Sequence, residues 1–159
     1  MITLAVAADL PDILNIYEYA RNFMIKNGNP TQWTKDYPGV ELLLKDIAKK
    51  HLYLCRDALS VYGVFAFIIG EDPTYRLIEN GAWLSDSPYG TIHRIAGNGT
   101  RKGVLAEALA FCGHQISHLR IDTHRDNLIM QHILPAAGFQ KCGMIYLTDG
   151  SLRIAYERL

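Results

Sequence analysis

A chain of 159 residues is long enough for one hydrophobic core, and 49% apolar with 20% charged residues excludes an intrinsically disordered protein. Lysine plus arginine and aspartate plus glutamate each total 16, so the basic excess typical of a nucleic-acid-binding protein is absent. The longest apolar run, Val61 to Ile69, is too short to cross a membrane, so we expect neither nucleic acid nor a membrane as partner.

The start of the chain and its cysteines indicate a compartment. The segment MITLAVAADLPD lacks the basic region and the long apolar run of a secretory signal. The three cysteines are odd in number and scattered, which favours reduced thiols buried as small apolar residues. We therefore expect a single cytoplasmic domain over residues 1–159.

Patterns in the amino-terminal half predict a strand, two helices and a hairpin. Asp9 precedes Pro11 and an apolar series at helical spacing, which is typical of a helix start. β-Branched and aromatic residues on both sides of 57–59 favour an antiparallel strand pair. In chain order we expect a strand at 2–6, a helix from Asp9 to about residue 27, a helix at about 40–50, and strands at 51–56 and 60–69.

The carboxy-terminal half is predicted to alternate strands and helices and to close in a hairpin. Residues 71–90 contain several prolines and glycines and allow only a short helical turn near 75–79. The pair Asp149-Gly150 is typical of a hairpin turn. The remaining elements are a strand at 91–96, a helix at 103–118, a strand at 119–123, a helix at 127–137, and strands at 138–147 and 151–157.

A glycine-rich segment, IAGNGTRKG, joins the strand at 91–96 to the helix at 103–118. Its glycines let the backbone approach a ligand closely and adopt positive φ. The helix start offers free N–H groups and the positive end of the helix dipole. Because Arg101 and Lys102 add charge, the segment is a candidate di- or polyphosphate site. A plain strand-to-helix turn with solvated cations fits the same residues.

Three phosphate-binding chemistries compete for this segment. A Walker loop needs lysine after the last glycine and then serine or threonine, whereas Lys102 precedes Gly103 and Val104 follows it. A dinucleotide site gains support from Asp122, which ends the next strand where a ribose-binding acid would lie. However, too few residues follow Asp122 to complete the parallel sheet of that fold. The third chemistry is acetyl-coenzyme A (acetyl-CoA).

From Ile92 to Tyr156 the chain resembles the GCN5-related N-acetyltransferase (GNAT) family. The resemblance rests, in order, on HRIA, the loop TRKGVLA, LRIDTHRDN, LIMQHILPAAGF and the closing CGMIYLTDGSLRIAYERL. It implies a mixed α/β (α+β) fold of three layers, with a central, mostly antiparallel sheet of six to seven strands and helices on both faces. The loop departs from the family pattern at Thr100, where the family has Arg or Gln, and at Leu105, where it has a small residue.

The resemblance also implies where acetyl-CoA would bind as a cosubstrate. The strands at 91–96 and 119–123 would separate and hold the pantetheine arm between them like an extra strand. A backbone N–H near Ile95, Ala96 or Gly97 would polarise the acetyl carbonyl, and Asn127 would meet the arm. The implied coenzyme-binding residues are Ile95, Ala96, Gly97, Arg101, Lys102, Gly103, Val104, Leu105, Ala106 and Asn127.

The resemblance leaves the catalytic groups less defined. Many members protonate the leaving thiolate with a tyrosine shortly before the Gly-Phe pair, and that place holds Leu134 here. Tyr146 on the following strand is the substitute candidate, although coenzyme A thiolate can also leave without an enzymic acid. His93 is the candidate base, because it would lie beside the acetyl group, on the sheet face opposite Ile92, and titrates near neutral pH. A core or edge tyrosine and a hydrogen-bonded sheet histidine are the structural alternatives.

Three residues are candidates for the acceptor site. Trp33 and Tyr37 belong to an aromatic loop between the first two helices, where family members often shape the acceptor pocket. They could equally cap the core between these helices. His124 follows a strand end, where ligands gather, and could instead pack under the loop or bind Asp126.

The leading hypothesis is an enzyme that transfers the acetyl group of acetyl-CoA to a primary amine of a small molecule or peptide, by direct attack on the thioester. The alternatives are a non-catalytic module that binds an acyl-CoA and a nicotinamide-dependent oxidoreductase. No metal is expected, because His114 and His118, four apart on one predicted helix, lack a third ligand. The acceptor and the oligomeric state stay open, with a homodimer as one option.

Overall fold

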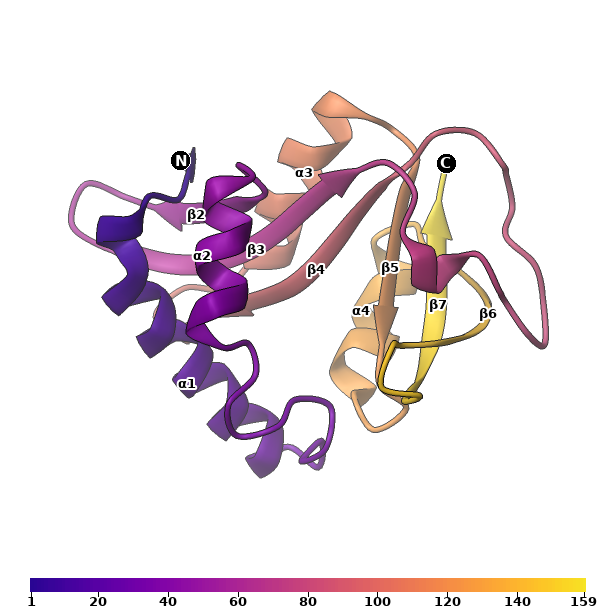
Figure 1. Cartoon of the computed structure of the whole chain (residues 1–159), viewed down its shortest axis with the longest axis horizontal. Helices are drawn as coiled ribbons and strands as arrows, with labels where there is room; N and C mark the ends of the chain where they lie inside the picture. Colours follow the sequence, from indigo (N-terminus) through magenta and orange to yellow (C-terminus); the bar gives the residue numbers. More distant parts are fainter. The chain divides into compact units, whose positions relative to one another are not determined.

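The computed structural model describes all residues from 1 to 159, and the chain divides into two compact units. The first unit comprises residues 1–67 and 93–111, and the second comprises residues 68–92 and 112–159. The strands follow the order β1-β2-β3-β4-β5-β7-β6, and four α-helices accompany them (Figure 1). Since the strand pairing is mostly antiparallel, the predicted fold class is confirmed. The single domain over 1–159 stays a prediction.

The first unit contains most of the amino-terminal elements. They are β1 (Ile2–Leu4), the short 3-10 helix η1 (Ala7–Asp9), α1 (Leu10–Lys26), α2 (Val40–Ala48), β2 (Leu52–Arg56) and most of β3 (Val61–Ile69). β2 pairs antiparallel with both of its neighbours, β1 and β3. The predicted hairpin is therefore confirmed. β4 (Gly90–Gly97) and α3 (Val104–Gln115) each begin in one unit and end in the other.

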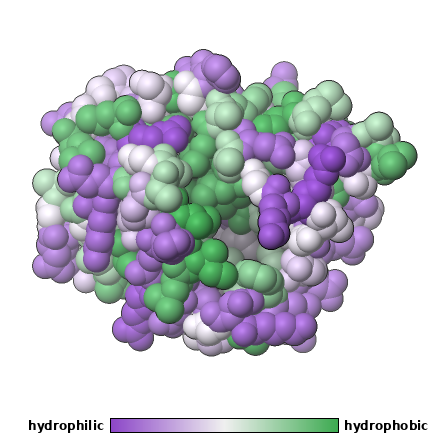
Figure 2. All heavy atoms as spheres, turned by 180° about the vertical axis from the view of Figure 1, so that it is seen from behind, coloured by the Kyte–Doolittle hydropathy of each residue, from purple (hydrophilic) through white to green (hydrophobic).

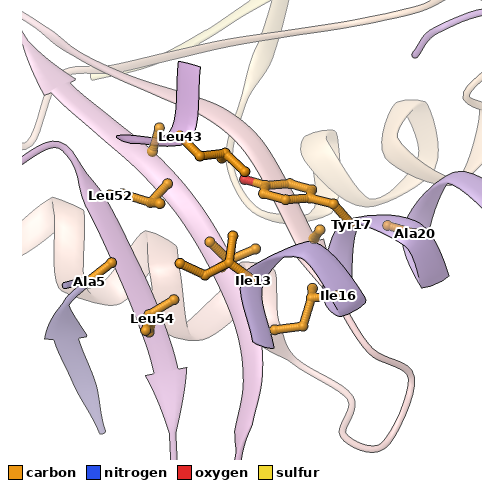
Figure 3. Close-up of a cluster of buried hydrophobic side chains, with 11 residues drawn as sticks. Ala5, Ile13, Ile16, Tyr17, Ala20, Leu43, Leu52 and Leu54 are labelled. Atoms are coloured by element: carbon orange, nitrogen blue, oxygen red, sulfur yellow. The ribbon is translucent and has the colours of Figure 1, made fainter. Parts of the chain in front are cut away.

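One face of β2 and β3 forms the main core of the first unit with α1 and α2. Apolar residues recur along α1 at three- and four-residue spacing, which places them on one side of the helix. The fully buried members include Ile13, Tyr17, Leu43, Leu52 and Leu54, all labelled in Figure 3. Each such aliphatic side chain contributes about 1.5–3 kcal/mol on burial, which explains why these helices form here.

The other face of the same strands is covered by the first part of α3. Tyr53 of β2 stacks on Phe65 of β3, and Phe111 of α3 lies 5.0 Å from the Tyr53 ring centroid. A Cβ atom at Gly63 would lie 2.7 Å from Val104 Cγ1, so only glycine lets α3 approach β3 this closely. The alternation of side chains along β2 and β3 therefore yields a helix layer on each face, as predicted.

The second unit is built around β5 and β7. Its elements are η2 (Pro73–Tyr75), β5 (Leu119–Thr123), α4 (Leu128–Ala136), β6 (Gln140–Tyr146) and β7 (Leu152–Arg158). The start of β4 pairs parallel with β5, and β7 pairs antiparallel with both β5 and β6. Tyr75, Tyr89, Ile145 and Ala155 form a small core, which anchors the irregular segment 70–89 on the strands.

A buried charged cluster reinforces this anchoring. The carboxylate of Glu157, with no exposed surface, accepts hydrogen bonds from the Leu84 backbone N–H and from Arg120 Nε at 2.9 Å, and its Oε1 lies 2.5 Å from His118 Nε2. The Arg120 guanidinium lies between the rings of Trp83 and Tyr89, at 4.0 and 3.9 Å. Burial alone would raise the pKa of Glu157, but these hydrogen bonds outweigh burial and hold the pKa below its ordinary value.

The predicted elements all exist, but some ends differ. The helix expected to reach residue 118 ends at Gln115. His118, the residue before β5, contacts Glu157 of β7 instead of continuing the helix. The interpretation of His114 and His118 as neighbours on one helix face is therefore wrong. No group of three or more potential ligands lies close enough together to hold a metal ion. The helical turn expected near 75–79 lies slightly earlier, at Pro73–Tyr75, where Asp72 caps it through the Thr74 N–H.

The molecular surface mixes polar and apolar side chains. Figure 2 shows apolar areas between hydrophilic ones on one face of the molecule. All three cysteines are free and buried, as expected, and burial raises the pKa of the Cys55 and Cys142 thiols to about 11. None of the helices combines the length and the apolarity that a membrane span requires.

Candidate functional site

The loop between β4 and α3 has the geometry expected of an anion-binding turn. Gly99 and Gly103 adopt positive φ of 77° and 91°. Asn98 fixes the loop start, because its backbone N–H donates to the Tyr62 carbonyl at 3.1 Å. The Asn98 side-chain oxygen in turn accepts from the Thr100 N–H and hydroxyl. These bonds form a tight turn that ends where α3 begins.

The amino end of α3 is open at this loop. Nothing lies within 4 Å of a Cβ built on Gly103, so its surroundings leave room for a ligand. Val104 faces inward, with its methyl groups close to Gly63 and Gly97, so only its backbone can face a ligand. Leu105 is half-buried and Ala106 is exposed. The small residue that the family pattern requires is thus displaced by one position, but it still lies in the exposed first turn.

The two cations of the loop, Arg101 and Lys102, differ in the interactions that they make. The guanidinium of Arg101 lies 4.8 Å from the centre of the Tyr62 ring, and its Nε lies 3.6 Å from Asp57 Oδ2. Arg101 is therefore directed to the β2–β3 hairpin. Lys102 is exposed. The groups left to attract an anion at this point are Lys102 and the backbone amides of the first turn of α3.

β4 contains an unexpected conformation next to His93. Arg94 adopts a φ of 51°, which interrupts the regular alternation of the strand. Its side chain pairs with Asp46 of α2 at 2.5 Å, and its carbonyl accepts a hydrogen bond from the Tyr17 hydroxyl at 2.9 Å. Ala96, two residues on, belongs to the core formed with α1 and α2. His93 and Ile95 are both half-buried beside this irregularity.

Sequence reasoning missed Arg94 and Asp46. Arginine seldom adopts positive φ, and a buried aspartate in an amphipathic helix gives no signal of its partner. Burial alone would lower the pKa of Arg94, but the neighbouring Tyr37 and Asp46 raise the pKa above its ordinary value. The guanidinium therefore stays charged beside the predicted acetyl position on β4.

Trp33 and Tyr37 lie together in the first unit. Their ring centroids are 6.1 Å apart, and Trp33 also makes an edge contact with Tyr17 at 5.6 Å. The Tyr37 carbonyl accepts a hydrogen bond from Arg21 at 3.0 Å. Both rings are half-buried, and Trp33 packs against the core. The aromatic loop thus contributes to the core and keeps part of its ring surface accessible.

The remaining predicted residues belong to the second unit. Asn127 caps α4, since its Oδ1 accepts the Met130 N–H at 3.1 Å. The Asp126 N–H donates to Nδ1 of His124 at 3.1 Å, so the neutral ring carries its proton on Nε2. Burial and then the charge of Arg153 lower the pKa of His124 below its ordinary value, and the ring is neutral near pH 7.

Two positions concern the protonation of the leaving thiolate, the candidate acid Tyr146 and Leu134, which occupies the place of the family tyrosine. The Tyr146 hydroxyl donates to Glu79 at 3.1 Å, and this hydrogen bond raises the pKa of Tyr146 above its ordinary value. The side chain is 43% exposed. Leu134 has no exposed surface, so the position that many family members give to a tyrosine is part of the apolar core here.

Comparison with known proteins agrees with this arrangement. No protein-family model and no curated protein matches the chain. Among solved structures, an acetyltransferase of the GNAT family from Streptococcus agalactiae is 33% identical with a TM-score of 0.88, and the match covers 100% of this chain and 94% of that one. An acetyltransferase from Staphylococcus aureus is 24% identical, with a TM-score of 0.73 and coverage of 99% and 97%. A GNAT-family acetyltransferase from Listeria monocytogenes is 20% identical, with a TM-score of 0.71 and coverage of 99% and 93%.

The full-length match at 33% identity, together with the β4–loop–α3 arrangement, shows the family. Members of this family use acetyl-CoA in general. The chain belongs to the GNAT family of acetyltransferases, and its enzyme class is that of the acyltransferases.

Proposed function

We propose that the protein is an N-acetyltransferase that moves the acetyl group of acetyl-CoA to a primary amine. The observation that carries this proposal is the turn between β4 and α3, with left-handed Gly99 and Gly103 before an open helix start. Such a turn suits a pyrophosphate, because the first N–H groups of α3 have no partner within the helix and no other group lies within 4 Å of the Cβ position of Gly103. Lys102 supplies the one exposed cation beside it that is not directed to Asp57.

The proposed reaction needs few protein groups. The neutral amine attacks the thioester carbon, a C–N bond forms, and a backbone N–H of Ile95, Ala96 or Gly97 stabilises the oxyanion. The C–S bond then breaks, and coenzyme A leaves as the thiolate. His93 accepts the proton that the amine loses, and the thiolate takes a proton from Tyr146 or from water. Asn127 contacts the pantetheine arm in this scheme.

The acceptor is a small molecule or a peptide that presents a primary amine. Trp33 and Tyr37 offer partly accessible aromatic surface in the first unit. The His124 tautomer presents an Nε2–H group, so its proposed role toward an acceptor is that of hydrogen-bond donor and not of base. The aromatic surface of the first unit suits an acceptor with an apolar part.

Calorimetric titration with acetyl-CoA, coenzyme A and NADH tests the proposal, followed by a thiol-release assay with a panel of amines. We expect micromolar binding of acetyl-CoA, no binding of NADH, and release of thiol with at least one amine. Binding without thiol release from any amine would favour a non-catalytic acyl-CoA-binding module, for which the buried Leu134 gives a reason. No binding of coenzyme A would contradict the proposal.

A further inference from the structure

An aromatic pair on α1 lies outside the face that the helix buries. Tyr19 and Phe23, four residues apart, are 43% and 44% exposed. Their rings are stacked, with centroids 6.5 Å apart and an angle of 20° between the planes. The core needs neither ring, because Ile16 and Tyr17 fill the buried side of the same turn.

The phenol end of Tyr19 lies directly over Gly99 of the β4–α3 loop. A Cβ built on Gly99 would fall 2.1 Å from the Tyr19 hydroxyl oxygen, 2.5 Å from Cζ and 3.0 Å from Cε1. The contact brings together residues 80 positions apart in the sequence, since 99 − 19 = 80. Glycine is therefore favoured at position 99 for two reasons: the φ is 77°, and an aromatic ring lies against the Cα atom.

Several other tyrosine hydroxyls of this molecule have a defined acceptor. Tyr17 donates to the Arg94 carbonyl, and Tyr62, which is also near the loop, donates to Glu107 at 2.7 Å. The Tyr19 hydroxyl has no such acceptor among the hydrogen bonds of the structure. A phenol O–H is a good donor to an anion. Its place beside the turn therefore leaves it available to a bound group.

The side-chain donors at the loop are few. Arg101 is directed to Asp57 and to the Tyr62 ring, which leaves Lys102 and the Tyr19 hydroxyl beside the backbone amides. A pyrophosphate has several acceptor oxygens and can therefore accept hydrogen bonds from a side-chain hydroxyl as well as from backbone N–H groups. The Tyr19 hydroxyl, which comes from α1, adds one donor to those of the loop.

We propose that Tyr19 is a binding residue for the acyl-CoA: its hydroxyl donates a hydrogen bond to a pyrophosphate oxygen held by the β4–α3 loop, and its ring, supported by Phe23, holds the loop at Gly99. This inference rests on the proposed acetyl-CoA specificity. It assigns to α1 a part in coenzyme binding that the sequence pattern of the loop does not contain.

The test compares Tyr19→Phe with the wild type by calorimetry, using coenzyme A as the probe. A hydrogen bond to a charged group contributes enough that we expect about tenfold weaker binding of coenzyme A. Tyr62→Phe is the matched control, because the Tyr62 hydroxyl already donates to Glu107. The affinity of this variant for coenzyme A should differ from that of the wild type by less than about twofold. Thermal unfolding of both variants checks that the fold is retained.

A second acetyl donor separates the loss of the pyrophosphate contact from a general loss of activity. S-Acetylpantetheine lacks the pyrophosphate, so Tyr19→Phe should reduce thiol release from acetyl-CoA but not from S-acetylpantetheine. Equal affinity of Tyr19→Phe and wild type for coenzyme A would overturn the inference and leave the proposed function intact. An equal loss with both donors would also overturn it. If the wild type itself does not bind coenzyme A, the proposed function fails first.

Discussion

Replacing Gly99 by alanine tests the packing of α1 on the loop, and Gly28→Ala is a control of the same backbone type. Gly99 and Gly28 have φ of 77° and 80°, so alanine pays the same left-handed penalty of about 1–2 kcal/mol at both. At Gly28 nothing lies within 4 Å of the new Cβ. At Gly99 the Tyr19 hydroxyl lies 2.1 Å away. The difference between the two variants therefore isolates the contact.

The size of the difference follows from what Tyr19 must do. To reach an ordinary separation of 3.4 Å the phenol end must move by at least 3.4 − 2.1 = 1.3 Å. A strained side-chain torsion costs about 0.5–1.5 kcal/mol, and weakening the stack with Phe23 costs a similar amount. We expect Gly99→Ala to lower the free energy of unfolding by about 1–2 kcal/mol more than Gly28→Ala does.

Urea unfolding followed by circular dichroism measures these free energies, and a double-mutant cycle assigns the excess. Tyr19→Ala removes the three atoms that lie nearest to the added methyl group, so in this background Gly99→Ala should cost no more than Gly28→Ala. Equal destabilisation by the two glycine variants in the wild-type background would refute the reasoning. So would an excess at Gly99 that persists after Tyr19 has been truncated.

The other predictions concern the buried cluster and the proposed base. Glu157→Gln removes the counter-charge of buried Arg120 and should lower the free energy of unfolding by about 3 kcal/mol, whereas exposed Glu79→Gln should change it by less than about 0.5 kcal/mol; urea titrations of both decide this. Because the pKa of Glu157 is lowered on folding, its contribution is complete above the unfolded value of about 4.3 and is lost as the pH falls through the lower folded value. Stability measured from pH 7 to 3 should therefore fall more steeply for wild type than for Glu157→Gln, and parallel curves would contradict this assignment. His93→Gln should lower kcat in the thiol-release assay by about a hundredfold, and an unchanged kcat would exclude His93 as the base.

Local patterns were sufficient for the elements that depend on short-range signals. The apolar spacing of α1 and the β-branched runs of β2 and β3 predicted these elements, because each buries one face regardless of the details of its partner. The glycine-rich turn before α3 was also predicted, since only glycine readily adopts the conformations found at Gly99 and Gly103.

Contacts between distant segments could not be predicted in this way. The left-handed Arg94 depends on Asp46 of α2 and Tyr17 of α1, neither of which is a neighbour in sequence. The end of α3 at Gln115 depends on the attraction of His118 to Glu157. In each case a side chain far along the chain decides a local conformation, and no pattern within a short window carries that information.

The placement of the two tryptophans has a spectroscopic consequence. Trp33 lies in the first unit, in edge contact with Tyr17, and Trp83 lies in the second, where its indole N–H donates to the Tyr75 carbonyl at 2.8 Å. Since the chain has only these two, each unit carries its own intrinsic fluorophore. Trp33→Phe and Trp83→Phe give single-tryptophan proteins, in which the emission of the remaining indole follows the loosening of one unit alone.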